Sequence, residues 1–258
     1  MNHVLVSDEG AVRTLTISRP ERRNALSPET AEELTQAISE AAGGRLGAIV
    51  LTGQGGHFSA GGDAEAILEA IGAGDENAPY RMMRTFHRLI ETIWNSPLPV
   101  VAAVSGVVYG GAFNLALACD LIYASADARF CQVFVRRGVI PDLGGAYLLP
   151  RLVGMQRAKE LMLLAQEIDA RRAEALGIVN SVLPDSAAAL SAAHDAAANL
   201  AAAPRYTLEM AKRLINGSTN STLAESLSAE ASAQSLVLGT PAAKEGFGAF
   251  LDRGKRKG

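Results

Sequence analysis

The feature that most constrains the fold is a long stretch, Leu98–Cys119, that holds no charged side chain. It opens with the apolar, β-branched run Val100–Val104, which is typical of a buried strand. The pair Gly110 and Gly111 follows, where the backbone can turn tightly or come close to a ligand. The segment 112–118 then predicts a short apolar helix. Glycine N–H groups at the start of such a helix favour an anion or a developing oxyanion.

The same stretch is about long enough to span a bilayer, which is the main alternative. It contains Pro99, Ser105 and Asn114 together with several glycines, and it divides into a strand-like half and a helix-like half. We therefore favour a buried strand–turn–helix over a membrane span.

Composition limits the class of protein. The chain has 258 residues, enough for one large domain or two small ones, and 48% apolar residues suit a globular core. A net charge of −3 gives no electrostatic reason to expect nucleic acid as a partner. The N-terminus lacks a basic region followed by a long apolar one, so we expect no signal peptide and a cytoplasmic location. Cys119 and Cys131 are expected to be reduced core thiols, because neither has metal-ligand spacing.

A second glycine-rich segment, 53–63, follows the predicted strand 48–52. A dinucleotide fingerprint fails because Phe58 stands where the third glycine is required, and no phosphate-binding P-loop or Gly-x-Ser-x-Gly elbow fits. Gly61 and Gly62 lead into a predicted helix over 64–71, a second place where glycine amides meet a helix start. Asp63 is expected to cap that helix and anchor the loop rather than to catalyse.

The rest of the chain predicts a βα-rich part over 1–195 and a helical part over 196–258. A hairpin is expected over 4–17 and strands over 121–124 and 177–182. Helices are expected over 28–42, 80–95, 146–152, 156–165, 170–176, 185–202, 206–216, 223–238 and 241–251. The basic tail Lys255–Lys257 is interpreted as solvated, with a phosphate contact as the alternative.

Asp142 lies between Pro141 and the pair Gly144 and Gly145, beside apolar residues. Two interpretations stay open from the local sequence. The carboxyl could cap the helix predicted over 146–152, or it could act as an acid or base.

Several motifs, taken in order and at their spacing, resemble the crotonase, or enoyl-CoA hydratase/isomerase, superfamily over nearly the whole chain. They are Arg19-Pro20 with Asn24-Ala25-Leu26, Phe58-Ser59-Ala60-Gly61-Gly62-Asp63, Ser105-Gly106 with Gly110-Gly111, Cys119-Asp120-Leu121, Gly138-Val139-Ile140-Pro141-Asp142-x-Gly144-Gly145, and Ala173-x-x-x-Gly177-Ile178-Val179-Asn180.

This resemblance implies an α/β fold with a crotonase-like ββα spiral core and a helical C-terminal trimerisation region. It implies a homo-oligomer, either a trimer or a dimer of trimers. The implied ligand is an acyl-CoA thioester, with no cofactor beyond the CoA moiety of the substrate, no metal, and no nucleic acid or membrane partner.

The resemblance also assigns site residues. The N–H groups of Gly62 and Gly111 would stabilise the oxyanion of a thioester enolate, and Asp142 would be the third catalytic group. Segment 72–86 would shape the acyl pocket. The expected substrate-binding residues are Arg22, Ala25, Ala60, Asp63, Ala64, Ile67, Asn114 and Phe134.

Two of these positions depart from a hydratase of this family, which has glutamates where this chain has Asn114 and Phe134. Two carboxyls hold and activate the water in hydration, whereas an amide takes no proton at neutral pH and phenylalanine cannot act at all. Asp142 matches instead the aspartate of dienoyl-CoA isomerases and of the phenylacetate-pathway ring-epoxide isomerase.

Three hypotheses follow. The first is an isomerase that shuttles a proton with Asp142, whose pKa we expect apolar neighbours such as Phe134 and Val139 to raise. The second is a hydratase in which Asn114 positions water and Asp142 supplies the acid and base. The third is a non-catalytic acyl-CoA-binding paralogue. The missing glutamates and the retained Asp142 favour the first.

Overall fold

The computed structural model describes residues 3–255, with side chains to residue 252, and its centre is a six-stranded sheet. The hairpin of β1 (Val4–Glu9) and β2 (Val12–Ile17) is antiparallel, and every other neighbouring pair is parallel. The remaining strands of this sheet are β3 (Ala48–Gly53), β4 (Val100–Val104), β6 (Leu121–Ser125) and β9 (Ser181–Leu183), in the order β1-β2-β3-β4-β6-β9.

A second sheet gives the fold its repeat. It contains β5 (Val107–Tyr109), β7 (Arg129–Cys131) and β8 (Ile168–Asp169), in the order β5-β7-β8. The chain passes from β4 in the first sheet to β5 in the second and then into helix α4 (Gly111–Leu117). It repeats the step from β6 to β7 and into a 3-10 helix, η2 (Val133–Arg137). These repeats confirm the expected ββα spiral.

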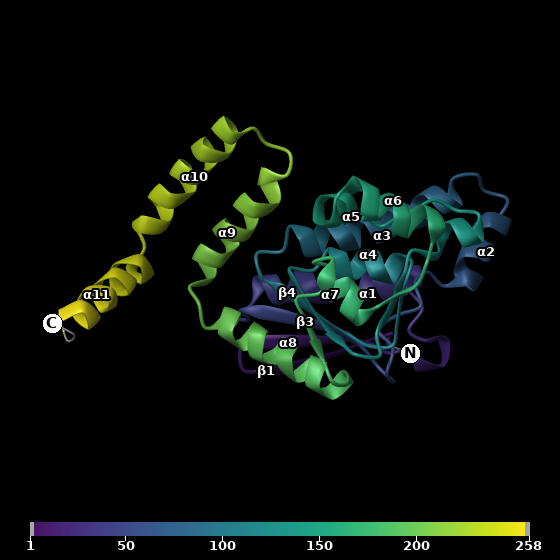
Figure 1. Cartoon of the computed structure of the whole chain (residues 1–258), viewed down its shortest axis with the longest axis horizontal. Coiled ribbons are helices and arrows are strands. Elements are labelled where there is room, and N and C mark those ends of the chain that lie inside the picture. Colours follow the sequence, from purple (N-terminus) through teal and green to yellow (C-terminus); the bar gives the residue numbers. More distant parts are fainter. Residues whose placement is uncertain (1–2, 256–258) are drawn as a thin grey trace.

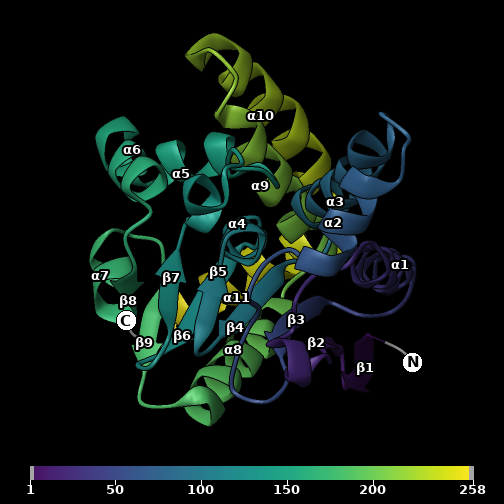
Figure 2. The ribbon, with the colours of Figure 1, turned by 90° about the vertical axis from the view of Figure 1, so that its right-hand side faces the viewer.

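Helices cover both faces of the larger sheet (Figure 2). One face packs on α1 (Pro28–Gly43), α3 (Ala78–Trp94) and α4, and the other on α8 (Ser186–Ala201). Successive residues of β3 show the alternation, since Ile49 packs in the first core and Val50 in the second. Burial on both faces explains why these strands are uninterrupted apolar runs. The other helices of the core are α2 (Ala64–Gly72), α5 (Gly145–Val153), α6 (Met155–Leu164) and α7 (Ala170–Ala175).

The strands differ from the predictions in two respects. The strand expected over 177–182 is shorter, because residues 177–180 form the turn that ends α7. There Gly177 has a φ of +76°, and its N–H donates to the Glu174 carbonyl at 2.9 Å. The second sheet was not predicted at all, because its strands have at most three residues and are too short to show a period.

The C-terminal helices leave the core (Figure 1). They are α9 (Arg205–Ser218), α10 (Leu223–Leu238) and α11 (Pro241–Lys255). The buried Lys212 joins α9 to the core, since its Nζ lies 2.8 Å from Asp120 Oδ2 and 3.0 Å from the Ile93 carbonyl. Beyond α9, large apolar side chains face solvent, namely Leu223, Leu227, Leu236, Leu238, Phe247, Phe250 and Leu251.

The domain boundary expected after residue 195 falls inside α8. Ala193 and Ala197 of this helix are both buried against the larger sheet, so the whole of α8 belongs to the core. The projecting part begins after α8. Of the basic tail, Arg256 and Lys257 lie outside the described residues. Among residues 3–255, no helix combines the length and the apolar character needed to cross a membrane.

Candidate active site

Backbone pairing brings the two glycine-rich segments together. Phe58 N–H donates to the Ser105 carbonyl at 2.8 Å, Ser59 N–H to Val107 at 3.0 Å, and Tyr109 N–H to Ser59 at 3.2 Å. A Cβ added at Gly61 would lie 2.6 Å from the Tyr109 carbonyl oxygen and 3.4 Å from the Gly111 nitrogen. Gly61 also has a φ of +92°, so only glycine fits this close approach.

The two expected oxyanion donors lie at helix starts on either side of this contact. Gly62 directly precedes Asp63, the N-cap of α2, and Gly111 is the first residue of α4. Within residues 3–255, neither N–H donates a hydrogen bond to another protein group. Free backbone donors at helix N-termini are suited to a developing oxyanion.

Asp63 caps α2, as predicted. Its side chain accepts from the Glu65 N–H at 3.0 Å, and its Oδ2 lies 2.7 Å from Nη2 of the buried Arg19. Burial opposes ionisation, but the hydrogen bond and positive charge of Arg19 outweigh it and hold the pKa of Asp63 below its ordinary value. A paired, ionised carboxylate of this kind is suited to anchoring a loop.

Arg19 and the loop that follows it extend this network. Arg19 Nη1 donates to the Ala25 carbonyl at 2.7 Å, and Ala60 N–H donates to the Arg23 carbonyl at 2.9 Å. Arg22 pairs with Glu65 at 2.7 Å. The expected CoA-side residues are thus gathered in one region, with Arg22 and Ala64 exposed, Ala60 and Ile67 half-buried, and Ala25 and Asp63 buried.

Sequence reasoning gave Asn24 no role in the site, although it organises this loop. Its Nδ2 donates to the carbonyls of Gln54 and His57, and its Oδ1 accepts from the Arg19 N–H. Asn24 also has a φ of +55°, a conformation that asparagine tolerates better than most residues. The Asn24-Ala25-Leu26 motif was the available signal.

Asp142 lies in the turn between η2 and α5, and its carboxyl faces Gly111, the expected oxyanion donor of α4. A Cβ added at Gly111 would lie 3.7 Å from Asp142 Oδ1 and 3.4 Å from Leu143 Cδ2. Oδ1 is buried and finds no hydrogen-bond partner among the described residues. The alternative of Asp142 as a helix cap is wrong, because the N-cap of α5 is Gly144, and only the Asp142 carbonyl oxygen accepts from that helix, from Gly145 N–H at 2.9 Å.

Burial raises the pKa of Asp142 to about 6, with a hydrogen bond to its own backbone acting weakly in the opposite direction. Of the two apolar neighbours expected to cause this, Phe134 is buried, but Val139 is about half exposed. Leu143, which sequence reasoning did not name, is buried beside the carboxyl. A carboxyl that titrates near neutral pH is suited to taking up and returning a proton.

Asn114 and Phe134 are the two positions where this chain differs from a hydratase, and both lie beside this site. Asn114 is fully buried, donates from Nδ2 to the Asp142 carbonyl at 2.8 Å and accepts at Oδ1 from Gln132 Nε2 at 2.8 Å. The Phe134 ring lies 3.7 Å from a Cβ added at Gly110, so it forms an apolar wall. Gln132 was not found from the sequence, because nothing local marks a contact between the end of β7 and α4.

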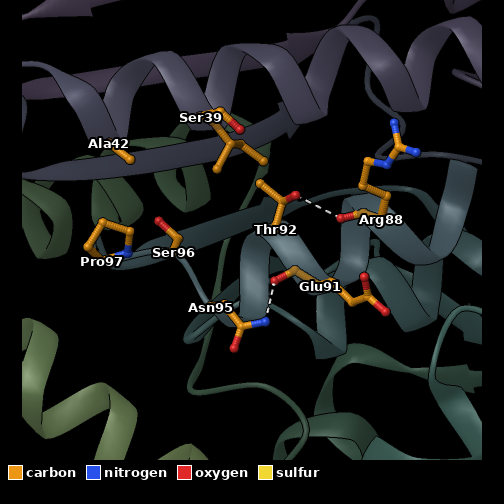
Figure 3. A pocket seen from close by; sticks show the side chains of 9 residues that line it. Ser39, Ala42, Arg88, Glu91, Thr92, Asn95, Ser96 and Pro97 are labelled. Atoms are coloured by element: carbon orange, nitrogen blue, oxygen red, sulfur yellow. Dashed lines mark hydrogen bonds between the residues drawn. The ribbon is translucent and has the colours of Figure 1, made fainter.

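A groove of about 410 Å³ lies elsewhere, between α1 and α3 (Figure 3). Ser39 and Ala42 from α1 face Arg88, Glu91 and Thr92 from α3 across it. None of the expected site residues lines this groove, and the candidate active site remains at the two glycine segments and Asp142. Among the described residues, no group of three histidine, cysteine, aspartate or glutamate side chains is placed to hold a metal ion.

Comparison with known proteins identifies the family. Residues 7–257 match the family model described as enoyl-CoA hydratase/isomerase. The chain is 33% identical to the 1,2-epoxyphenylacetyl-CoA isomerase of Escherichia coli (strain K12), covering 97% of this chain and 96% of that protein. It is 33% identical to the short-chain-enoyl-CoA hydratase of Clostridium acetobutylicum, covering 100% of this chain and 98% of that protein. The crystal structure of an enoyl-CoA hydratase from Polaromonas sp. JS666 matches with a TM-score of 0.93 and 34% identity over 97% of both chains.

The crotonase fold expected from the sequence is thus shared by this structure and its solved relatives. The chain belongs to the enoyl-CoA hydratase/isomerase family of acyl-CoA enzymes.

Proposed function

We propose that this enzyme moves a double bond, or opens a ring epoxide, in an unsaturated acyl-CoA, with Asp142 as the proton shuttle. One observation carries the proposal. The Asp142 carboxyl faces Gly111, its Oδ1 is buried and has no hydrogen-bond partner among the described residues, and burial raises its pKa to about 6.

For a β,γ-unsaturated thioester, the ionised Asp142 carboxylate removes the proton from the α-carbon. The electron pair of the broken C–H bond moves into the thioester, and negative charge develops on the carbonyl oxygen. The N–H groups of Gly62 and Gly111 donate to that oxygen, and such a donor is worth ~10²–10³ in rate. Asp142, now protonated, returns the proton to the γ-carbon, and the product is the α,β-unsaturated isomer.

Direct addition of water is the second candidate, because hydratase names outnumber isomerase names among the relatives. The residues of this site argue against it. Asn114 uses both ends of its amide inside the protein, and Phe134 offers no proton acceptor, so Asp142 alone would have to hold and activate a water. A non-catalytic acyl-CoA-binding role is disfavoured by the raised pKa of Asp142 and by its buried Oδ1, which has no hydrogen-bond partner among the described residues and therefore costs stability.

We also propose that the C-terminal helices assemble the chain into a trimer or a dimer of trimers. Phe247 is 61% exposed and Phe250 is 73% exposed on α11, and such apolar side chains along α10 and α11 mark a surface that another copy would cover. The acyl-CoA thioester is the proposed substrate class, and the CoA-side residues named above are proposed to bind it.

Mass spectrometry in deuterated water tests the proposed reaction. The enzyme is incubated separately with a 3-enoyl-CoA and a 2-enoyl-CoA. We expect the 3-enoyl-CoA to give a conjugated product without the mass of water, and this product gains deuterium when the Asp142 proton exchanges with solvent before it is returned. A hydrated product from the 2-enoyl-CoA, without isomerisation of the 3-enoyl-CoA, would overturn the proposal in favour of a hydratase.

A further inference from the structure

We infer that Asn114 and Gln132 are positioning residues that hold the Asp142 turn so that its carboxyl faces Gly111. This inference deepens the proposed function and rests on it, because it assumes that Asp142 moves the proton. Neither amide needs to touch the substrate for this role.

A chain of two hydrogen bonds runs from the second sheet to the turn. Gln132 Nε2 donates to Asn114 Oδ1 at 2.8 Å, and Asn114 Nδ2 donates to the Asp142 carbonyl at 2.8 Å. Both amides are fully buried, so water does not compete for these bonds. Because Asn114 lies one turn after Gly111 on α4, the helix that carries an oxyanion donor also holds the backbone of Asp142.

The turn needs such a hold because it is strained. Leu143 directly follows Asp142 and has a φ of +46°, a left-handed conformation that costs a non-glycine residue about 1–2 kcal/mol. Gly144 follows with a φ of +76°. Strained residues of this kind persist only where the surrounding contacts over-determine them.

Close packing of the turn on Asn114 supports the same inference. A Cβ added at Gly145 would lie 2.3 Å from Asn114 Nδ2 and 2.5 Å from its Oδ1. Gly145 therefore lets the backbone after Asp142 lie directly on the amide, and a side chain there would push the two apart. The contact therefore depends on the missing side chain of Gly145 as well as on the Asn114 amide.

The two buried side-chain oxygens without a partner among the described residues lie at the ends of this arrangement. They are Gln132 Oε1 and Asp142 Oδ1. Such groups are costly and usually serve a function. Here the cost is consistent with an arrangement that leaves one carboxyl oxygen, Asp142 Oδ1, unbonded and available to the substrate.

The variant Asn114→Asp tests the inference, because it keeps the shape of the side chain and removes the Nδ2 donor. The matched control is Asn216→Asp, since Asn216 Nδ2 also donates to a main-chain carbonyl, that of Trp94 at 2.9 Å, on the remote α9. Steady-state kinetics and the pH profile of kcat are measured for both in the full-length protein, with circular dichroism to confirm folding.

We expect kcat of Asn114→Asp to fall by ~10²-fold with KM nearly unchanged, because a misplaced reacting group affects the chemical step. The acid limb of its pH profile should also move to higher pH, since a new carboxyl beside Asp142 opposes its ionisation. Asn216→Asp should keep the kcat and the profile of the original enzyme. If Asn114→Asp behaves like Asn216→Asp in both readouts, the inference is overturned.

Two further variants separate the inference from the function beneath it. Gln132→Met removes the donor to Asn114 and tests the inference even if Asn114→Asp does not fold. We expect kcat to fall without a rise in KM. An unchanged kcat contradicts the inference. Asp142→Asn tests the proposed function itself. An active Asp142→Asn enzyme overturns both, whereas an inactive one with normal Asn114→Asp and Gln132→Met enzymes overturns the positioning role alone.

Discussion

Two aspartates lie beside Gly62 and Gly111, the two glycines proposed to hold the oxyanion, and their surroundings differ in almost every respect. Asp63 follows Gly62, caps α2 and is paired with the buried Arg19. Asp142 faces Gly111, caps nothing and leaves a buried oxygen without a partner among residues 3–255. The pKa of Asp63 is therefore lowered and that of Asp142 is raised to about 6.

The difference teaches how one fold assigns opposite roles to one residue type. A partner of opposite charge fixes a carboxylate in its ionised form and makes it part of the scaffold. Burial without a partner leaves the carboxyl able to exist in either form, which proton transfer requires. A pair of acids whose surroundings push their pKa values apart thus separates anchoring from chemistry, and each role can be tested separately.

The largest effect is expected from Asp142→Asn. The amide keeps the shape of the side chain but cannot take a proton, so turnover of a 3-enoyl-CoA should fall by ~10²–10⁴-fold. Binding of the acyl-CoA, measured by isothermal titration calorimetry, should change little. Retention of most of the activity would show that Asp142 is not the acid or base.

Asp63→Ala should act mainly on stability, whereas Asp142→Asn should act mainly on turnover. The change leaves the buried Arg19 charge unpaired and removes the cap of α2, so the free energy of unfolding should fall by about 3–5 kcal/mol. Urea unfolding followed by circular dichroism measures this loss. Asp8→Ala is the control, because Asp8 pairs with Arg13 at an exposed site and should cost about 1 kcal/mol or less.

How far the sequence predicts these roles depends on how local each signal is. The apolar run of β4 and the start of α1, where Ser27 caps and Pro28 follows, were predicted because neighbouring residues carry the whole signal. The capping role of Asp63 was also predicted from its neighbouring residues. The family motifs predicted that Gly62 and Gly111 supply the oxyanion donors, and this remains a prediction.

The parts that could not be predicted depend on contacts between distant segments. Gln132 and Asn114 meet only because β7 and α4 pack together, and no period or motif marks that contact. The local sequence also left open a capping role for Asp142, which is excluded because the turn at Leu143 and Gly144 moves the helix start past the aspartate. The three-residue strands of the second sheet form because the spiral brings them together, and their own sequences do not specify it.

Asp142→Asn should also make the protein more stable at pH 7 while it lowers turnover. The folded-state pKa of Asp142, about 6, lies above the ordinary value of 3.8, so the folded state holds this proton more tightly than the unfolded state does. Its contribution to stability is complete below about pH 4 and is lost as pH rises through about 6. The amide removes that loss and should add about 1–3 kcal/mol to the free energy of unfolding at pH 7.

The measurement is urea unfolding of both proteins at pH 4 and pH 7. The difference between them should be small at pH 4 and should favour Asp142→Asn at pH 7. Equal stability at both values would mean that the carboxyl is not destabilised by burial and would weaken the contrast with Asp63.

The smallest expected effect is the pH dependence of kcat/KM in the unmodified enzyme, which tests whether Asp142 titrates in this range and Asp63 does not. Because the ionised form of Asp142 removes the proton, kcat/KM should fall on the acid side of about pH 6, by roughly tenfold per pH unit well below it. Asp63 should not contribute a limb in this range, since its pKa is lowered by Arg19. Rates of 3-enoyl-CoA isomerisation between pH 5 and pH 8 would show a single acid limb. A limb that survives in a partly active Asp142→Asn enzyme would have to belong to another group, and the division of roles between the two aspartates would then be wrong.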